Sequence, residues 1–185
     1  MKLMIIIAST RPGRVGLPVG NWFYEIARKD KRFETELVDL AELNLPFLDE
    51  PNLPALQQYT KEHTKKWSRM VNSSDCFVIV TPEYNFSGPA TLINALDFVY
   101  KEWNYKAVGF VSYGGLSGGT RSVQHLKNLV TTLKMTPLYE AVNIPFIASQ
   151  IKNGNFIPND KNEAAAVVML DELYKVALET RELRK

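Results

Sequence analysis

Hydroxyls, arginines and glycines stand together near the start of the chain, in Ser9-Thr10-Arg11-Pro12-Gly13-Arg14-Val15-Gly16. They follow an apolar run, residues 4–8, that predicts a buried strand. They precede residues 16–28, whose apolar positions fall on one helical face. At such a strand-to-helix turn, free backbone N–H groups and the positive end of the helix dipole favour an anion. The segment therefore predicts a phosphate site, with a polar, solvated turn as the alternative.

The common nucleotide-binding motifs do not fit this loop. It has no G-x-x-x-x-G-K-[ST], so the lysine and the magnesium-binding hydroxyl of a P-loop are missing. It has no G-x-G-x-x-G either. A loop of hydroxyls and arginines remains, and it suits a terminal monophosphate that can be wrapped on several sides.

Two further loops have unusual compositions. After the apolar residues 78–80 comes Pro82-Glu83-Tyr84-Asn85-Phe86-Ser87-Gly88-Pro89, whose aromatic side chains suit a flat heteroaromatic ring. After residues 107–111 comes Ser112-Tyr113-Gly114-Gly115-Leu116-Ser117-Gly118-Gly119-Thr120-Arg121, where the glycines let backbone approach a ligand closely. Each loop alone could be a tight turn with a helix cap. Together the three loops predict a phosphate at one end of a site and a planar ring at the other.

The elements that must position these loops alternate along the chain. We expect strands at residues 2–8, 34–39, 76–81, 107–112 and 137–139, and helices at 16–28, 57–73, 90–100, 119–133 and 163–182. This alternation predicts a single α/β domain over residues 1–185, a three-layer flavodoxin-like sandwich with a five-stranded parallel sheet of order 2-1-3-4-5. In such a sheet the ligand lies at the carboxyl ends of the strands. The proline-rich excursion at 44–54 is either functional or a surface tether.

Three motifs carry a resemblance to a known family: Ser9-x-Arg11-x-x-Arg14, Pro82-Glu83-Tyr84-Asn85 and Gly114-Gly115-x-x-Gly118-Gly119-x-Arg121. They resemble the NADPH-dependent FMN reductase family, which includes flavin, quinone, chromate and azo-dye reductases. The resemblance implies a flavodoxin-like fold, one FMN per subunit, and NADPH or NADH as the reductant. It also departs from the pattern at one position, because many members have a serine where Arg14 stands.

The resemblance implies a set of residues for the cofactor. The phosphate would be held by Ser9, Arg11 and Arg14, with Val15 and Gly16 at the helix start. The isoalloxazine ring would be bordered by Pro82, Glu83, Tyr84 and Asn85, with Ser112, Gly114 and Gly115 at its polar edge. N–H groups of the Gly114–Gly115 turn would stabilise negative charge on the ring.

The implied reaction passes hydride from the nicotinamide to FMN and then electrons to a small acceptor: a quinone, free flavin, azo compound or metal oxyanion. The flavin carries this chemistry, so no catalytic side chain and no metal is expected, and His63 and His125 are predicted to be surface residues. The open face of the flavin would be lined by Tyr84, Phe86 and Tyr113, with Trp103 and Phe47 as further candidates. Arg14, Arg121 and Lys101 are the candidates to bind a 2′-phosphate.

Two other classes of protein remain open. A flavodoxin-type carrier would bind FMN without reacting with nicotinamide, but such carriers tend to be acidic and to lack arginines in the first loop, whereas this chain has a net charge of +2. A scaffold or regulator on the same fold would bind no flavin at all.

Composition limits the partners and the location. The 185 residues carry 45% apolar and 23% charged residues with no block of like charge, so neither nucleic acid nor a membrane is expected as a partner. The strand that starts at Lys2 leaves no room for a signal peptide, and Cys76, the only cysteine, cannot form an internal disulfide. Both features predict a cytoplasmic protein. Apolar residues Leu92, Ile93, Leu96, Phe98 and Val99 exceed one helix face and predict a homodimer or homotetramer.

Overall fold

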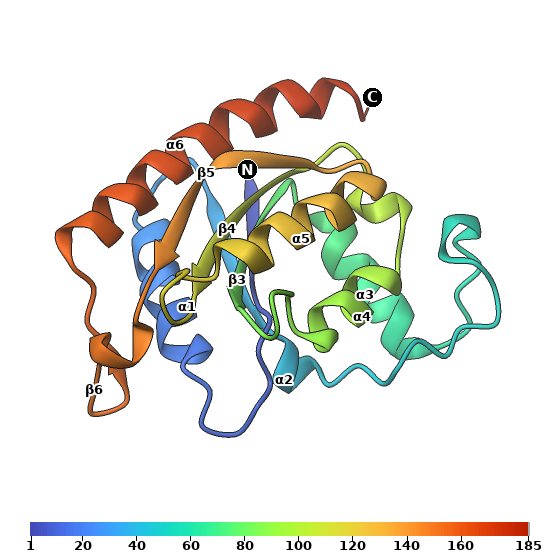
Figure 1. Ribbon diagram of the computed structural model, residues 1–185. Helices are drawn as coiled ribbons and strands as arrows, with labels where there is room; N and C mark the ends of the chain where they lie inside the picture. The colour runs from blue at the N-terminus through green and yellow to red at the C-terminus, as the bar shows by residue number, and fades with distance from the viewer. Residues whose placement is uncertain (185) are drawn as a thin grey trace.

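The computed structural model describes residues 1–184, and a five-stranded parallel sheet lies at its centre (Figure 1). The order β2-β1-β3-β4-β5 confirms the predicted topology. The strands are β1 (Lys2–Ile7), β2 (Glu34–Asp39), β3 (Cys76–Pro82), β4 (Ala107–Tyr113) and β5 (Thr136–Ile144). All four pairings are parallel, so the carboxyl ends of the strands meet along one edge, the lower edge in Figure 1.

Helices cover both faces of the sheet, because successive residues of the inner strands point to opposite sides and are apolar on both. Leu3 and Ile5 of β1 pack toward α1 (Gly16–Ala27) and α6 (Asp160–Glu182). Met4 and Ile6 pack toward α3 (Glu62–Ser73), α4 (Ala90–Asp97) and α5 (Thr120–Thr132). This three-layer arrangement fixes the loops at the carboxyl edge between two rigid layers.

Several element boundaries differ from the prediction. Helix α6 begins at Asp160 rather than 163, because the side chains of Asn159 and Asn162 form a reciprocal capping box before it. Helix α3 begins at Glu62 rather than 57, after the 3-10 turn η1 (Pro54–Leu56), which Gln57 ends in a left-handed conformation. The short elements α2 (Leu40–Leu43), η2 (Lys101–Trp103), η3 (Ile147–Gln150), β6 (Ile151–Lys152) and β7 (Asn155–Phe156) were not predicted.

Four of the five residues that suggested an oligomer lie inside the subunit. Leu92, Leu96, Phe98 and Val99 are buried in the core between the sheet and α4, and only Ile93 is partly exposed, so no surplus apolar face is left. Trp103 is also fully buried, and its indole N–H donates to the Leu96 carbonyl at 3.1 Å. The argument for an oligomer from this helix was therefore wrong, as was the placement of Trp103 beside a flavin.

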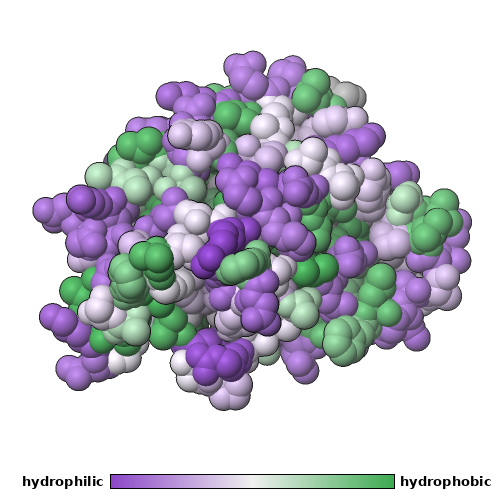
Figure 2. Space-filling model, in the orientation of Figure 1, coloured by the Kyte–Doolittle hydropathy of each residue, from purple (hydrophilic) through white to green (hydrophobic). Residues whose placement is uncertain are grey.

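The excursion between α2 and α3, residues 44–61, is tied down by side chains. Asn94 of α4 donates to the Pro46 carbonyl at 2.7 Å and accepts from the Leu48 N–H at 3.0 Å. At its far end the buried Glu102 carboxylate accepts from the Tyr59 hydroxyl at 3.0 Å. The apolar side chains of the excursion are nevertheless exposed, and hydrophobic residues, drawn in green, gather over it at the right of Figure 2. The exposed ones are Phe47, Leu48, Leu53 and Leu56.

Two predictions about individual features can be compared with this fold. Cys76 is buried in β3 as predicted, and burial raises the pKa of its thiol to about 12, which keeps the thiol protonated and unreactive.

Within residues 1–184 no helix has the length and apolar character needed to cross a bilayer.

Candidate active site

The three predicted loops meet at the carboxyl edge of the sheet. We call them the β1 loop (residues 8–15), the hairpin loop (83–89) and the glycine loop (114–119). The Tyr113 hydroxyl donates to Ser9 Oγ at 3.0 Å, which joins the end of β4 to the β1 loop. The Ser117 hydroxyl donates to the Glu83 carboxylate at 2.8 Å, which joins the glycine loop to the hairpin loop. The structure therefore places all three loops in one connected site.

The first turn of α1 is open to an anion. Val15 is its N-cap residue and supplies no side-chain hydrogen bond to the helix. The N–H groups of Gly16 and Leu17 have no partners inside the helix, as at any helix start. Gly13, at φ +70°, turns the chain into this start. The free N–H groups and the helix dipole make this the natural position for a phosphate.

The two arginines of the β1 loop have different tasks. Arg11 is exposed. Within residues 1–184 its guanidinium makes one hydrogen bond, to the carbonyl of the neighbouring Pro12 at 3.2 Å. Arg14 donates through both terminal nitrogens to the Asp39 carboxylate, one of them at 2.6 Å, and also to the Ser9 carbonyl at 2.6 Å. The hydrogen bond to Asp39 outweighs burial and raises the pKa of Arg14. Arg14 thus braces the loop, and Arg11 is the cation left free for a phosphate.

Tyr113 lies beneath the β1 loop. We expected it on the open face of a flavin, but it is only 4% exposed, and burial raises the pKa of its hydroxyl. A Cβ on Gly16 would lie 2.2 Å from Ser9 Oγ and 2.4 Å from the Tyr113 hydroxyl. Gly16 is therefore required by packing, and Tyr113 supports the loop rather than touching substrate.

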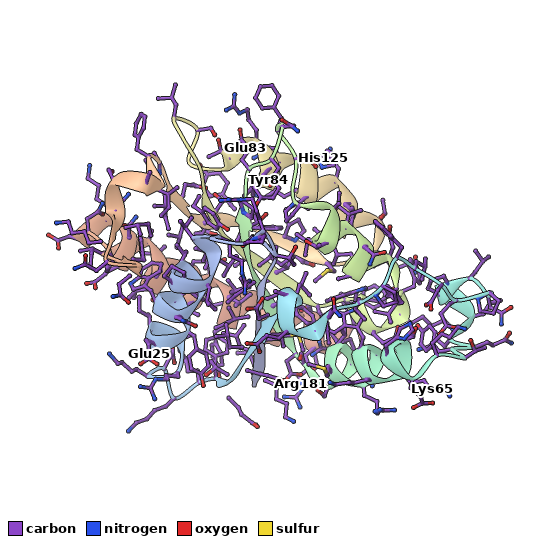
Figure 3. The ribbon with its side chains drawn as sticks, turned by 90° about the horizontal axis from the view of Figure 1, so that it is seen from below. Glu25, Lys65, Glu83, Tyr84, His125 and Arg181 are labelled. Carbon is purple, nitrogen blue, oxygen red and sulfur yellow. The ribbon has the colours of Figure 1, made fainter. Side chains whose placement is uncertain are left out.

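The hairpin loop is a tight turn with two exposed aromatic rings. Tyr84 and Ser87 exchange two backbone hydrogen bonds of 2.9 Å, and Asn85 and Phe86 between them have φ values of 50° and 67°. Positive φ at both central residues is the type I′ pattern. Tyr84 and Phe86 are both exposed. In Figure 3 Tyr84 lies with Glu83 and His125 on one side of the molecule, away from Glu25 and Arg181.

The Glu83 side chain is engaged by the glycine loop and by the start of α5. Its carboxylate accepts from the Ser117 hydroxyl, from the Arg121 backbone N–H at 3.2 Å and from Arg121 Nε at 2.7 Å. Burial alone would raise the pKa of Glu83, but these hydrogen bonds outweigh it and lower the pKa. The guanidinium of Arg121 also lies 4.0 Å from the centre of the Phe86 ring. Glu83 and Arg121 form a brace between the two loops.

Most polar groups in and beside the glycine loop already have hydrogen-bond partners within the protein. The Gly114 N–H donates to the Ile144 carbonyl at 3.2 Å, so it is not free for a flavin as expected. The Ser112 hydroxyl is buried within 2.8 Å of the Gly118 carbonyl and of Asn143 Oδ1. Gly115 differs, because nothing lies within 4 Å of the position of an added Cβ. Gly115 is therefore the point where a ligand can approach this backbone.

A fourth segment, after β5, contributes to the site and was missed. The Phe146 N–H donates to the Gly115 carbonyl at 2.9 Å, and the Ile147 N–H donates to the Gly114 carbonyl at 3.0 Å. A hollow of about 430 Å³ lies between the glycine loop and this segment. The sequence offered no motif here beyond an apolar pair after Pro145.

The remaining predicted residues lie at the rim or elsewhere. His125 is exposed as predicted, and its Nδ1 lies 3.0 Å from the Ser87 hydroxyl. His63 is partly buried and pairs with Asp49 at 2.8 Å, outside the three loops. Phe47 is exposed on the excursion. Among residues 1–184 no cluster of His, Cys, Asp and Glu side chains could hold a metal ion.

The site fits a phosphate-bearing flat cofactor such as FMN. The open α1 start, with the exposed Arg11, suits the phosphate, whereas the predicted Ser9 is fully buried against Tyr113. The exposed rings of the hairpin loop and the accessible backbone at Gly115 suit the flat ring.

Comparison with known proteins identifies the family. The model of the NADPH-dependent FMN reductase family matches residues 1–149. An NAD(P)H-dependent FMN reductase of Schizosaccharomyces pombe is 41% identical over 148 residues, 78% of this chain and 74% of that protein. An NAD(P)H:quinone oxidoreductase of Solanum tuberosum is 32% identical over 133 residues, 70% of this chain and 66% of that protein.

Solved structures agree on the fold. A flavoenzyme NAD(P)H:(acceptor) oxidoreductase from Paracoccus denitrificans has a TM-score of 0.75 over 97% of this chain and 98% of that chain, at 18% identity. The flavodoxin-like prediction is thereby confirmed. Because a matching family model spans most of the chain, the protein belongs to the NADPH-dependent FMN reductase family and is an oxidoreductase that uses FMN and NAD(P)H.

Proposed function

We propose that this enzyme takes hydride from NADPH or NADH onto FMN held by the three loops and passes the electrons to a small acceptor of the quinone class. The supporting observation is the connected edge of the sheet. There the loop with an open helix start and a free arginine is joined by hydrogen bonds to the loops that carry the exposed aromatic rings and Gly115. Free flavin, azo compounds and metal oxyanions are the other acceptors that the family resemblance allows.

The residues of the phosphate end bind and orient the cofactor. The N–H groups of Gly16 and Leu17 would donate to the phosphate, and Arg11 would add a charge-assisted hydrogen bond. Ser9 is fully buried beneath the loop, where its Oγ accepts a hydrogen bond from Tyr113, so it would support the loop rather than reach the phosphate directly. Arg14 and Asp39 hold the loop in shape.

The residues of the ring end set the position of the flavin. Pro82, Tyr84 and Asn85 would border the ring on one side and Gly115 on the other. Bound FMN supplies the two-electron chemistry, accepting hydride and delivering electrons. Pro82, which is buried at the end of β3, would keep water from the side of the ring that faces the sheet.

Arg121 is the candidate to bind a 2′-phosphate of NADPH. Two of the three candidates drop out: Arg14 is paired with Asp39, and Lys101 lies in η2, which precedes β4 at the opposite edge of the sheet. Arg121 uses Nε for Glu83 and keeps about half of its side chain exposed. Its terminal nitrogens would bind the phosphate, which favours NADPH over NADH.

An absorbance experiment tests the proposal. The protein is incubated with FMN, desalted, and mixed anaerobically with NADPH and then with NADH. Retained yellow colour that bleaches, followed by recovery on addition of a quinone, is the expected result. Colour that neither nucleotide bleaches would show a carrier of the flavodoxin type, and no retained colour would overturn the site.

The oligomeric state is a separate proposal. We propose a homodimer or homotetramer, now supported by the exposed apolar side chains of the excursion, such as Phe47, Leu53 and Leu56, rather than by α4. Size-exclusion chromatography with light scattering tests it, and a monomer at micromolar concentration would refute it.

A further inference from the structure

The hollow beside the glycine loop has an apolar lining. It is lined by Gly114 and Gly115, and by residues 146–149 after β5, and these carry no charged side chain. A charged ligand would lose its hydration there without gaining a partner, whereas a flat, uncharged ring would bury apolar surface. The chemistry of this lining therefore favours an aromatic ligand without charge.

Phe146 has an unusual backbone conformation in this lining. Its φ of +48° lies in the left-handed region, which a bulky aromatic residue seldom adopts. Hydrogen bonds hold it there, from its own N–H to the Gly115 carbonyl and from the Ser149 N–H to its carbonyl at 2.9 Å. Its ring is 56% exposed, so packing within the subunit does not explain the strain. Strained residues of this kind gather at ligand sites.

The hollow adjoins the place proposed for the flavin. Gly115 borders both. A Cβ added to Gly115 would meet no atom of the described chain within 4 Å, apart from those of its chain neighbours, so this side of the backbone is open to a ligand. The nicotinamide dinucleotide carries charged phosphates, which Arg121 at the hairpin loop suits better than this lining. The hollow is thus left for the second substrate.

We propose that this hollow is the subsite for the ring of the electron acceptor and that Phe146 determines which flat acceptors enter it. The inference rests on the function proposed above. In the overall reaction NAD(P)H gives one hydride and water gives one proton, so that a quinone gains two electrons and two protons and leaves as the hydroquinone, with NAD(P)⁺ as the other product.

The Phe146→Gly variant tests this proposal without endangering the fold. Glycine adopts positive φ freely, so the substitution removes the ring and relieves the strain together. Tyr105→Gly is a matched control, because Tyr105 is also an exposed aromatic at positive φ, 59°, but precedes β4 at the opposite edge of the sheet. Both variants are loaded with FMN and assayed with NADPH against menadione, a flat quinone, and ferricyanide, a small hydrophilic anion.

We expect Phe146→Gly to raise the KM for menadione roughly tenfold, because half-buried aromatic surface is lost, with kcat little changed. Ferricyanide kinetics, the rate of flavin reduction by NADPH and the Kd for FMN should stay as in the wild type, and Tyr105→Gly should change none of them. An unchanged KM for menadione overturns the proposal. Weaker FMN binding would overturn it by placing Phe146 against the flavin, and a changed oligomeric state would do so by making the hollow a subunit interface.

Failure of the proposed function would look different. In that case the wild type itself would not retain FMN, or its flavin would not be reduced by NADPH. If the wild type passes both checks, the comparison of the two quinone KM values tests the acceptor subsite alone.

Discussion

Replacing Glu83 by glutamine should loosen the brace between the hairpin loop and the glycine loop. The carboxylate accepts three hydrogen bonds, from the Ser117 hydroxyl, the Arg121 N–H and Arg121 Nε. Glutamine keeps the shape but offers a single acceptor oxygen, and its NH₂ group must face a donor. The variant should therefore lose the ionic interaction with Arg121 and at least one hydrogen bond.

The structure sets the size of the effect. The side chain of Glu83 is 8% exposed while that of Arg121 is 51% exposed, so solvent screens the ionic part to about 0.5–1 kcal/mol. A lost hydrogen bond to a buried charged acceptor contributes about 1–2 kcal/mol more. The free energy of unfolding should fall by about 1.5–3 kcal/mol, and the Kd for FMN should rise by up to about tenfold.

Urea denaturation at several pH values measures this effect. The pKa of Glu83 is lowered in the folded protein, so its stabilisation is present above the unfolded value of about 4.3 and is lost as the pH falls through the folded pKa. The difference between wild type and Glu83→Gln should therefore shrink below about pH 4.3. Glu62→Gln is the matched control, because Glu62 pairs with Lys65 on an exposed helix face, where solvent screens the pair, and the substitution should leave the unfolding midpoint close to that of the wild type. Equal unfolding midpoints for wild type and Glu83→Gln would refute the brace.

Other substitutions test the phosphate end. Arg11→Ala should weaken FMN binding by about 1.5–3 kcal/mol, as measured by flavin fluorescence titration, and an unchanged Kd would move the phosphate elsewhere. Gly16→Ala places a Cβ 2.2 Å from Ser9 Oγ and should cost about 1–3 kcal/mol, visible as a Tm lowered by roughly 3–10 °C; a wild-type Tm would contradict the packing argument. Asp39→Asn leaves the largely buried Arg14 without its carboxylate and should cost about 2–4 kcal/mol in urea denaturation, whereas a wild-type midpoint would show that the ion pair is dispensable.

The inner strands were predictable because burial on both faces produces continuous apolar runs. Strand β2 matches its predicted range, and β1, β3 and β4 differ from theirs by one residue. The edge strand β5 was predicted only at residues 137–139, although it spans Thr136–Ile144. It contains Pro137 and an almost fully exposed Tyr139, and its register with β4 shifts between Val108 and Phe110. A proline and a bulge remove the alternation that predicts strands.

The loops of the candidate site were predictable where their local sequence determines their shape. The glycines and the open helix start lie in contiguous segments, so their pattern is visible in the sequence. The pairing of Arg14 with Asp39 and the contact of Tyr113 with Ser9 join residues far apart in the chain, 25 and 104 positions respectively. Such contacts depend on the register of the folded sheet. For the same reason the segment at Phe146 carries no local signal, since only the end of β5 brings it to Gly115.

The contact between Ser9 and Tyr113 has a thermodynamic consequence. Ser9 follows β1, Tyr113 ends β4, and β3 lies between these strands, so one hydroxyl pair links the two halves of the cofactor site. A ligand that orders the β1 loop then also orders the start of the glycine loop. By linkage, each of two ligands bound at these loops raises the affinity for the other by the same factor. Riboflavin and inorganic phosphate, as separate halves of FMN, should accordingly bind with positive cooperativity. The cofactor would then owe part of its affinity to this coupling in addition to its direct contacts.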